Sequence, residues 1–259
     1  MNLPEKIAAC EIAYAKQFCT DYEDENIIRF RHPEIKDMYS LNYTFIKNKN
    51  KELKLRSLCE EEIAYSVRTR EKYTNICING SIHPRILTYI KYPSILTING
   101  FYVFDMKNFD TLTALDGCEV KKVVALETLE EVLKIDIDVD GATTDAEFCT
   151  RRLYGKSRVY LSSEGVDAYI GYHNGEAIGR CDLFIHETVA KIEDFSIPQN
   201  QQRKGYGKTM LKQLIQIAVD KGCETIYLVT DESETAKDMY IKSGFNRLTE
   251  TTEVRFILR

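Results

Sequence analysis

The stretch that decides the fold is residues 191–221, KIEDFSIPQNQQRKGYGKTMLKQLIQIAVDK. It opens on a strand-like run, passes through a turn marked by Gly205 and Gly207, and ends in a segment with helical spacing. Apolar residues recur in that segment at intervals of three and four, as on the buried face of a helix, namely Met210, Leu211, Leu214, Ile217 and Ala218. The stretch therefore predicts a strand, a glycine turn and an amphipathic helix that ends near Gly222.

The glycine turn has the features of an anion-binding site. The first N–H groups of a helix have no partner within the helix, so they can face a phosphate in the preceding turn. Gly205 and Gly207 lack a Cβ, which allows unusual dihedral angles and lets a phosphate approach the main chain closely. A GxG turn also joins many strands to helices without any ligand. The turn alone therefore does not decide between a pyrophosphate site and an ordinary connection.

A second pattern follows the helix. Residues 225–229, TIYLV, are typical of a buried strand, and a short helix then carries Ala236, Met239 and Tyr240 before Gly244 and Phe245. The QxxGxG turn after a strand, followed by AxxMYxxxGF, resembles the GNAT superfamily of acyl-CoA N-acyltransferases. The resemblance covers roughly residues 190–245. It implies acetyl-CoA as co-substrate and a mixed, mostly antiparallel sheet flanked by helices.

The resemblance also implies where the cofactor would bind. Main-chain amides of the glycine turn would hold the diphosphate, and the end of the preceding strand would pair with the pantetheine arm like an added strand. Ser233 stands three residues before the alanine of the last motif, where the family often has asparagine. The implied cofactor-binding residues are Phe195, Ser196, Ile197, Gln202, Arg203, Lys204, Gly205, Tyr206, Gly207, Lys208 and Ser233.

Two residues are candidates for proton transfer. Acyl transfer needs an uncharged amine, so a proton acceptor is useful, and Glu193 lies on the strand before the turn, where similar proteins often carry a carboxylate. Asp194 should point to the opposite face of a regular strand. Tyr240 matches the tyrosine that the family commonly uses as general acid for the departing thiolate. The alternatives are that both carboxylates are solvated, that water replaces them, and that Tyr240 only packs.

The chain is long enough for two domains, which we place at residues 1–117 and 118–259. The fold class is α/β (α+β), with the GNAT-type sheet in the second domain and a smaller α+β domain before it. The first domain carries neither motif and is either a degenerate copy of the same fold or an unrelated cap. Asn99–Gly100 predicts a two-residue hairpin between strands 94–98 and 101–106, and Asn174–Gly175 predicts another in the second domain.

Charge excludes some classes of partner. The net charge is −5, and all of it lies in the second domain, because residues 1–117 hold 16 basic and 16 acidic side chains. A nucleic-acid-binding protein normally carries a basic excess, so we expect no nucleic-acid partner. The acidic excess favours a cationic amine acceptor, a small molecule or a peptide, although it also fits a protein that is simply kept soluble.

The cysteines, histidines and apolar stretches indicate the cellular compartment and whether a metal is bound. The eight cysteines show no CxxC pair and the four histidines are isolated, so we expect reduced thiols and no metal site. No stretch approaches the roughly 18 apolar residues of a membrane span, and the polar start lacks the apolar core of a signal peptide. We therefore expect a cytoplasmic monomer or homodimer without a membrane partner.

One further pattern competes with this interpretation. Residues 136–147, DIDVDGATTDAE, satisfy the calcium-loop pattern DxDxDGx₅E, with helix signals on both sides. Ile137 and Val139 occupy positions that are usually polar in such loops, and no second hand follows. The run is therefore a calcium loop, an acidic loop that attracts the amine acceptor, or a solvated loop.

Together these patterns predict an N-acetyltransferase that moves an acetyl group from acetyl-CoA to a primary amine by direct attack in a ternary complex. A non-catalytic module that binds or senses acyl-CoA is the alternative. A calcium-responsive interaction protein is a third hypothesis, which depends on residues 136–147.

Overall fold

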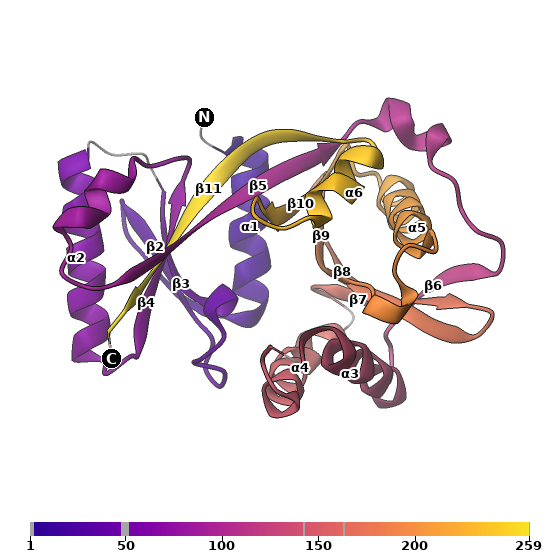
Figure 1. The fold of residues 1–259 in the computed structure, drawn as a ribbon, viewed down its shortest axis with the longest axis horizontal. Helices are drawn as coiled ribbons and strands as arrows, with labels where there is room; N and C mark the ends of the chain where they lie inside the picture. The colour runs from indigo at the N-terminus through magenta and orange to yellow at the C-terminus, as the bar shows by residue number, and fades with distance from the viewer. Residues whose placement is uncertain (1–2, 48–51, 142, 163, 259) are drawn as a thin grey trace.

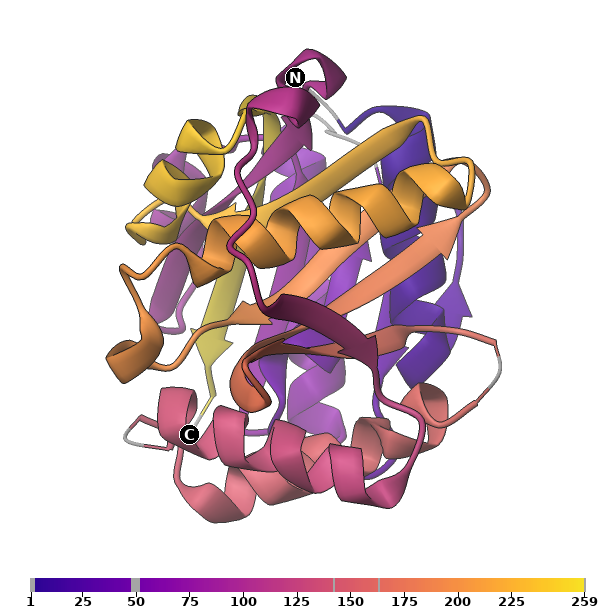
Figure 2. The same ribbon diagram turned by 90° about the vertical axis from the view of Figure 1, so that its right-hand side faces the viewer.

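The computed structural model describes residues 3–47, 52–141, 143–162 and 164–258, and places eleven strands in one continuous sheet. The strand order is β1-β2-β3-β4-β11-β5-β10-β9-β8-β7-β6. Helices cover both faces of this sheet, as Figures 1 and 2 show. The predicted fold class, a mixed and mostly antiparallel sheet flanked by helices, is confirmed.

The elements follow the chain in two groups. Those of residues 1–117 are α1 (Glu5–Phe18), β1 (Thr20–Glu23), β2 (Ile27–Arg31), η1 (Tyr39–Leu41), β3 (Asn42–Ile46), α2 (Glu52–Arg68), β4 (Tyr73–Asn79), η2 (Pro84–Tyr89), β5 (Ser94–Phe104) and η3 (Met106–Thr111). Those of residues 118–259 are β6 (Cys118–Lys122), α3 (Leu126–Asp140), α4 (Ala146–Tyr160), β7 (Asp167–His173), β8 (Glu176–His186), β9 (Val189–Ser196), η4 (Gln199–Gln201), α5 (Tyr206–Asp220), β10 (Thr225–Asp231), α6 (Ala236–Lys242) and β11 (Phe245–Ile257).

The same strand arrangement occurs twice in the sheet. In the first group β2 and β3 are antiparallel, β3 and β4 are parallel with α2 between them, and β4 is antiparallel to β11. In the second group β8 and β9 are antiparallel, β9 and β10 are parallel with α5 between them, and β10 is antiparallel to β5. Each half thus builds the same order of strands around one crossover helix.

The two halves exchange their last strands. β5 belongs to the first group in sequence but pairs with β10, and β11 belongs to the second group but pairs with β4. The two long strands also pair with each other and run side by side between the halves in Figure 1. The sheet therefore continues across the boundary that we placed between residues 117 and 118.

The hairpin predicted at Asn99–Gly100 is wrong. Both residues lie inside β5, where Gly100 pairs with Thr230 of β10 and with Glu250 of β11. A Cβ at Gly100 would overlap the carboxylate of Glu232, so the glycine serves a close approach rather than a turn. Pairing on both sides outweighs the local turn preference. The hairpin predicted at Asn174–Gly175 is confirmed, because it joins β7 to β8.

Three apolar clusters hold the helices on the sheet. α5 buries the face that its spacing predicts and packs with α6 on one side, while α1, α3 and α4 cover the other side of the same strands. The third cluster lies under α2, between the outer strands of the first half, and β11 contributes Val254 and Phe256 to it. The last strand of the chain therefore completes the core of the first half.

The acidic run at residues 136–147 is not a calcium loop. Asp136, Asp138 and Asp140 lie in the last turns of α3, and a helix cannot wrap these side chains around one ion. Asp136 and Asp140 are instead paired with arginines, with Arg180 Nε 2.6 Å from Asp136 Oδ1 and Arg152 Nη2 2.6 Å from Asp140 Oδ2. Ala142 of the run lies outside the described residues. Those that are described contain no group of three metal-binding side chains.

The exchange of strands leads to a prediction about folding. The Phe256 side chain is fully buried under α2, so Phe256→Ala should destabilise the protein by about 3–5 kcal/mol. Because β11 also belongs to the second half, we expect one cooperative unfolding transition at lower denaturant, measured by both circular dichroism and tyrosine fluorescence. Leu53→Ala is the control, because the Leu53 side chain lies on α2 and is 80% exposed. It should change the free energy of unfolding by only a few tenths of a kcal/mol. Two separate transitions would contradict the expectation.

Candidate active site

The central feature of the site is an opening between two neighbouring parallel strands. β9 and β10 are paired from Val189–Thr225 to Ile192–Leu228, and no pairing between them follows. β9 nevertheless continues to Ser196 and β10 to Asp231, the latter paired with β5. The edge of β9 that faces β10 is therefore free beyond Ile192, and an extended ligand can add to it as a strand.

The glycine turn lies directly after this opening. The backbone at Arg203 and Gly205 has φ values of 64° and 90°, and Gly205 is the N-cap of α5, which begins at Tyr206. The first intrahelical bond runs from Thr209 N to Gly205 O at 3.1 Å. The preceding amides at the helix start are left without intrahelical partners, as at any helix N-terminus, and can receive an anion.

Packing brings the turn, the strand end and the last motif together. A Cβ on Gly207 would lie 2.8 Å from Met239 Sδ and 3.8 Å from Phe195 Cε1, so α5 approaches both α6 and the end of β9. The Phe195 ring in turn meets the Tyr240 ring edge-on at 6.3 Å between centroids. Residues that the sequence connected only through motifs are thus neighbours in space.

Tyr240 is a buried phenol. Its ring packs between Phe195 and Phe245, and the side chain is 6% exposed. No hydrogen bond of its hydroxyl is recorded among the described residues. Burial, followed by the negative charge of Glu193, raises the pKa of Tyr240 above that of an ordinary phenol. The group therefore stays protonated at neutral pH and is able to donate.

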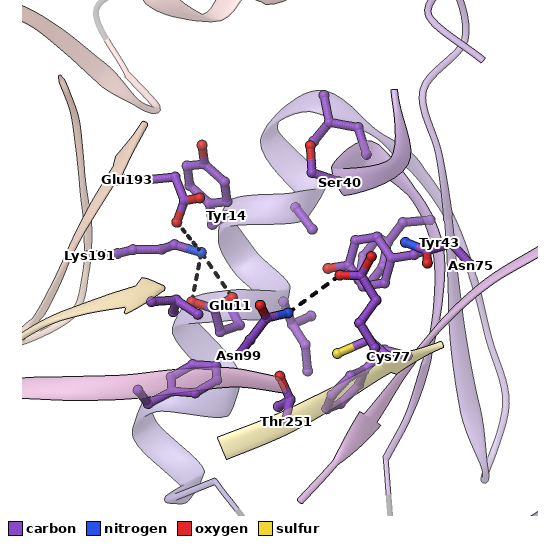
Figure 3. Close-up of a pocket in the computed structure, with 18 of the residues that line it drawn as sticks. Glu11, Tyr14, Ser40, Tyr43, Asn75, Cys77, Asn99, Lys191, Glu193 and Thr251 are labelled. Carbon is purple, nitrogen blue, oxygen red and sulfur yellow. Dashed lines mark hydrogen bonds and ion pairs between the residues drawn. The ribbon is translucent and has the colours of Figure 1, made fainter. Parts of the chain in front are cut away.

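Glu193 lies at the start of the opening, beside a buried lysine. Lys191 Nζ is 3.0 Å from Glu193 Oε2 and 2.7 Å from Glu11 Oε1 of α1, as Figure 3 shows. Burial raises the pKa of Glu193 above that of an ordinary glutamate, against the opposing charge of Lys191. A carboxylate whose pKa is raised toward neutrality is better suited to accept a proton at neutral pH.

Asp194 does not point away from Glu193, as a regular strand would require. The pairing of β9 with β8 shifts register between Glu193 and Ser196, and Asp194 has a φ of 48°. This β-bulge turns both carboxylates toward the same cavity. The expectation that only one of them faces the cleft is therefore wrong.

Buried ion pairs fix the bulge. Lys156 Nζ lies 2.6 Å from Asp194 Oδ2, and Arg180 Nη2 lies 3.4 Å from the same oxygen. Arg180 also pairs with Asp182 at 3.1 Å, so β8, β9 and α4 share one network. Burial alone would raise the pKa of Asp194, but the charges of Lys156 and Arg180 hold it well below its usual range.

The carboxylates line a cavity of about 270 Å³ between the two halves of the sheet (Figure 3). Glu193 and Asp194 contribute from β9, and Thr230 and Asp231 from the diverging end of β10. The opposite wall comes from the first half of the chain. It includes Glu11 and Tyr14 of α1, Tyr43 of β3, Asn75 and Cys77 of β4 and Asn99 of β5.

The other predicted cofactor residues occupy different positions around the turn. Gln202, Arg203, Lys204 and Lys208 are exposed, and Gln202 Nε2 donates to the carbonyl of Ile197 at 3.0 Å. Tyr206 is buried and its hydroxyl lies 2.9 Å from His173 Nδ1, so it packs away from the turn. Ser233 follows β10 and donates through N and Oγ to Asp231 Oδ1, each at 2.8 Å.

Several lining residues were missed by the sequence patterns. Glu11, Asn75, Asn99 and Glu253 come from four elements that are far apart in the chain. No spacing rule connects them, since the exchange of β5 and β11 brings them together. Of these four residues, the sequence patterns included only Asn99, and they predicted it to lie in a hairpin turn with Gly100.

Comparison with known proteins agrees with this geometry. Residues 138–245 match the Acetyltransferase (GNAT) family. Over 72 residues the chain is 40% identical to a Bacillus subtilis (strain 168) protein named "uncharacterized N-acetyltransferase CgeE", and this match spans only 27% of the chain and 28% of that relative.

Two solved structures resemble the whole chain in fold. A conserved protein of unknown function from Staphylococcus epidermidis has a TM-score of 0.77 at 14% identity, with 93% of this chain and 95% of that chain covered. A GCN5-related N-acetyltransferase from Kribbella flavida has a TM-score of 0.71 at 11% identity, with 99% and 96% covered. The segment that matches the family model therefore lies within a fold that these structures share over nearly the full length.

Proposed function

We propose that the protein is an N-acetyltransferase that moves an acetyl group from acetyl-CoA to a primary amine of a small molecule or peptide. The observation that carries this proposal is the divergence of β9 and β10 beside a glycine turn, with a carboxylate and a protonated phenol at the opening. The family match supports acyl transfer in general.

The residues of the opening fit an acyl-CoA. The free edge of β9 at Phe195, Ser196 and Ile197 would hold the pantetheine arm by main-chain hydrogen bonds. The amides of residues 202–208 would hold the diphosphate, helped by the exposed charges of Arg203, Lys204 and Lys208. Preorganised main-chain donors of this kind also polarise a thioester oxygen.

The reaction follows from the two titratable groups. The neutral amine nitrogen attacks the thioester carbonyl carbon, a C–N bond forms and the C–S bond breaks. Glu193 accepts the proton that the nitrogen loses, directly or through water, and Tyr240 donates a proton to the departing thiolate. Net charge is conserved, because Glu193 becomes neutral when it takes the amine proton and Tyr240 becomes a phenolate when it gives its proton to the thiolate.

The setting of the reaction is part of the same proposal. All eight cysteines are free thiols, which fits the reducing cytoplasm. None of the helices in the described parts of the chain combines the length and apolarity that a bilayer crossing needs. We further propose that residues 1–117 are a degenerate GNAT-like copy, since their strands repeat the arrangement of residues 118–259.

The first prediction concerns the glycine turn. Gly205→Ala forces a Cβ onto a backbone with φ of 90° and should weaken CoA binding by about tenfold, which corresponds to ~1.4 kcal/mol. Calorimetric titration with CoA measures this. Gly222→Ala is the matched control, because Gly222 has a similar φ of 82° with open space around it and follows the opposite end of α5. Equal affinities in both variants would contradict the role of the turn.

The second prediction concerns the general acid. Tyr240→Phe keeps the ring contacts with Phe195 and Phe245 but removes the donor, so kcat should fall by about 10² or more while CoA affinity stays the same. Release of thiol from acetyl-CoA in the presence of an amine measures the rate. Tyr154→Phe, at a half-exposed tyrosine on α4, is the control. Unchanged turnover in Tyr240→Phe would remove this residue from its role.

The third prediction concerns the general base. Glu193 must be ionised to accept a proton, so kcat/KM should fall as the pH drops through its raised pKa, above the ordinary value of 4.5. In Glu193→Gln this acidic limb should disappear and the rate should be about 10² lower. An acceptor of low basicity separates this limb from protonation of the amine itself. An unchanged profile in the variant would assign proton acceptance to water.

The non-catalytic alternative has a distinct outcome. A module that only binds acyl-CoA would bind CoA in calorimetry and lose affinity in Gly205→Ala, yet release no thiol with any amine.

A further inference from the structure

The cavity beside Glu193 extends well beyond the place where the thioester would lie. It reaches from β9 across β10 and β5 to β11 and β4, all neighbours in the sheet. The backbones of β9 and β11 are three strand spacings apart, roughly 14 Å. In Figure 3 Glu193, Lys191 and Glu11 lie at one side of the cavity, and Tyr43 and Asn75 lie at the other. The cavity therefore has a far end, built by the first half of the chain and β11.

A buried polar atom without a partner marks this far end. Asn75 is 3% exposed, and while its Nδ2 donates to the carbonyl of Tyr39 at 3.2 Å, its Oδ1 has no hydrogen-bond partner among the described groups. An unsatisfied buried acceptor costs about 1–3 kcal/mol, so native proteins rarely keep one without a use. Asn75 Oδ1 is therefore able to accept a hydrogen bond from a bound molecule.

A carboxylate lies in the same region. Glu253 of β11 is paired in register with Cys77 of β4, and both line the cavity. Asn99 Nδ2 lies 3.4 Å from Glu253 Oε2, which is a long hydrogen bond. Arg255 Nη2 lies 3.5 Å from Glu253 Oε1, and the Arg255 guanidinium stacks over the Tyr39 ring and does not line the cavity. Arg255 is thus paired with Oε1 of Glu253, whereas Oε2 receives the long hydrogen bond from Asn99.

The wall as a whole is acidic. Its charged residues are the carboxylates Glu11, Glu193, Asp194, Asp231 and Glu253 and the ammonium groups Lys156 and Lys191. Lys191 is already shared by Glu11 and Glu193, and Lys156 is held by Asp194 and Asp182. Neither lysine is available to Glu253. The far end consequently offers hydrogen-bond acceptors and negative charge to a ligand.

We propose that the acceptor is a small, elongated amine whose second end carries a hydrogen-bond donor, an ammonium or a hydroxyl group, held by Glu253 and Asn75. This inference rests on the proposed function, because the first end is the nitrogen that attacks beside Glu193. A cavity of about 270 Å³ is at the lower end of ligand sites and admits a metabolite rather than a folded protein surface. The first half of the chain thus selects the acceptor.

The experiment compares three amines with the same six-carbon chain, namely 1,6-diaminohexane, 6-amino-1-hexanol and hexylamine. With the full chain and acetyl-CoA, the diamine and the amino alcohol should have kcat/KM values at least about tenfold above that of hexylamine, which lacks the second donor. If kcat/KM is higher for the diamine than for the amino alcohol, the far end prefers a cation. If the two kcat/KM values are equal, the far end requires only a hydrogen-bond donor.

Glu253→Gln tests the residue itself. It should lower kcat/KM about tenfold for the diamine, mainly through KM, and leave hexylamine unchanged. Glu130→Gln, at an exposed glutamate of α3 outside the cavity, is the control. Equal kcat/KM for the three amines, or an equal loss for all of them in Glu253→Gln, overturns the proposal.

Failure of the proposed function has a different signature. If no amine releases thiol although CoA binds, the transferase activity is wrong. Calorimetric titration of the same three amines then still tests the far end, since the diamine should bind more tightly than hexylamine and lose that advantage in Glu253→Gln. Equal binding of the three amines would overturn the far-end site independently of any turnover.

Discussion

The site depends on the point at which two parallel strands stop pairing. β9 and β10 are paired as far as Ile192 and Leu228, and the proposed general base and the free edge of β9 lie beyond this last pair. The bulge at Asp194 contributes to this arrangement, because it turns Glu193 and Asp194 to one side. Leaving a charge buried without its partner costs several kcal/mol, so the pairs of Asp194 with Lys156 and Arg180 hold the backbone in this state. The opening is thus maintained by electrostatics as well as by packing.

The exchange of β5 and β11 is the second constraint, since it converts two similar halves into one sheet with a cavity at their junction. The halves are not equivalent. The connection from β3 to α2 covers residues 47–51, KNKNK, and contains no glycine, whereas the corresponding connection from β9 to α5 contains Gly205. The first half contributes strands β1 to β5, the crossover helix α2 and one wall of the cavity.

The sequence was informative where chemistry depends on local spacing. The glycine turn, the helix at residues 206–220 and the position of Tyr240 follow from patterns within a few dozen residues, and the structure brings Phe195, Gly207 and Tyr240 together. The sequence was misleading where distant strands decide. Asn99–Gly100 has the local preference of a turn but is paired on both sides, and Asp136 and Asp140 match a calcium loop but lie on a helix opposite Arg180 and Arg152. Long-range pairing and buried arginines are not visible in any local window.

The same reasoning explains why overall charge was a weak guide to the acceptor. The net charge of the second half includes Asp136 and Asp140, which suggested an acidic entrance, yet both are neutralised within the fold. The charge that a ligand meets is set by the carboxylates that remain after internal pairing. Glu253 lines the cavity although Arg255 lies 3.5 Å from its Oε1, and the last strand of the chain carries it into the wall built by the first half. Acceptor selection is therefore a property of the joined sheet, and neither half of the sequence contains it alone.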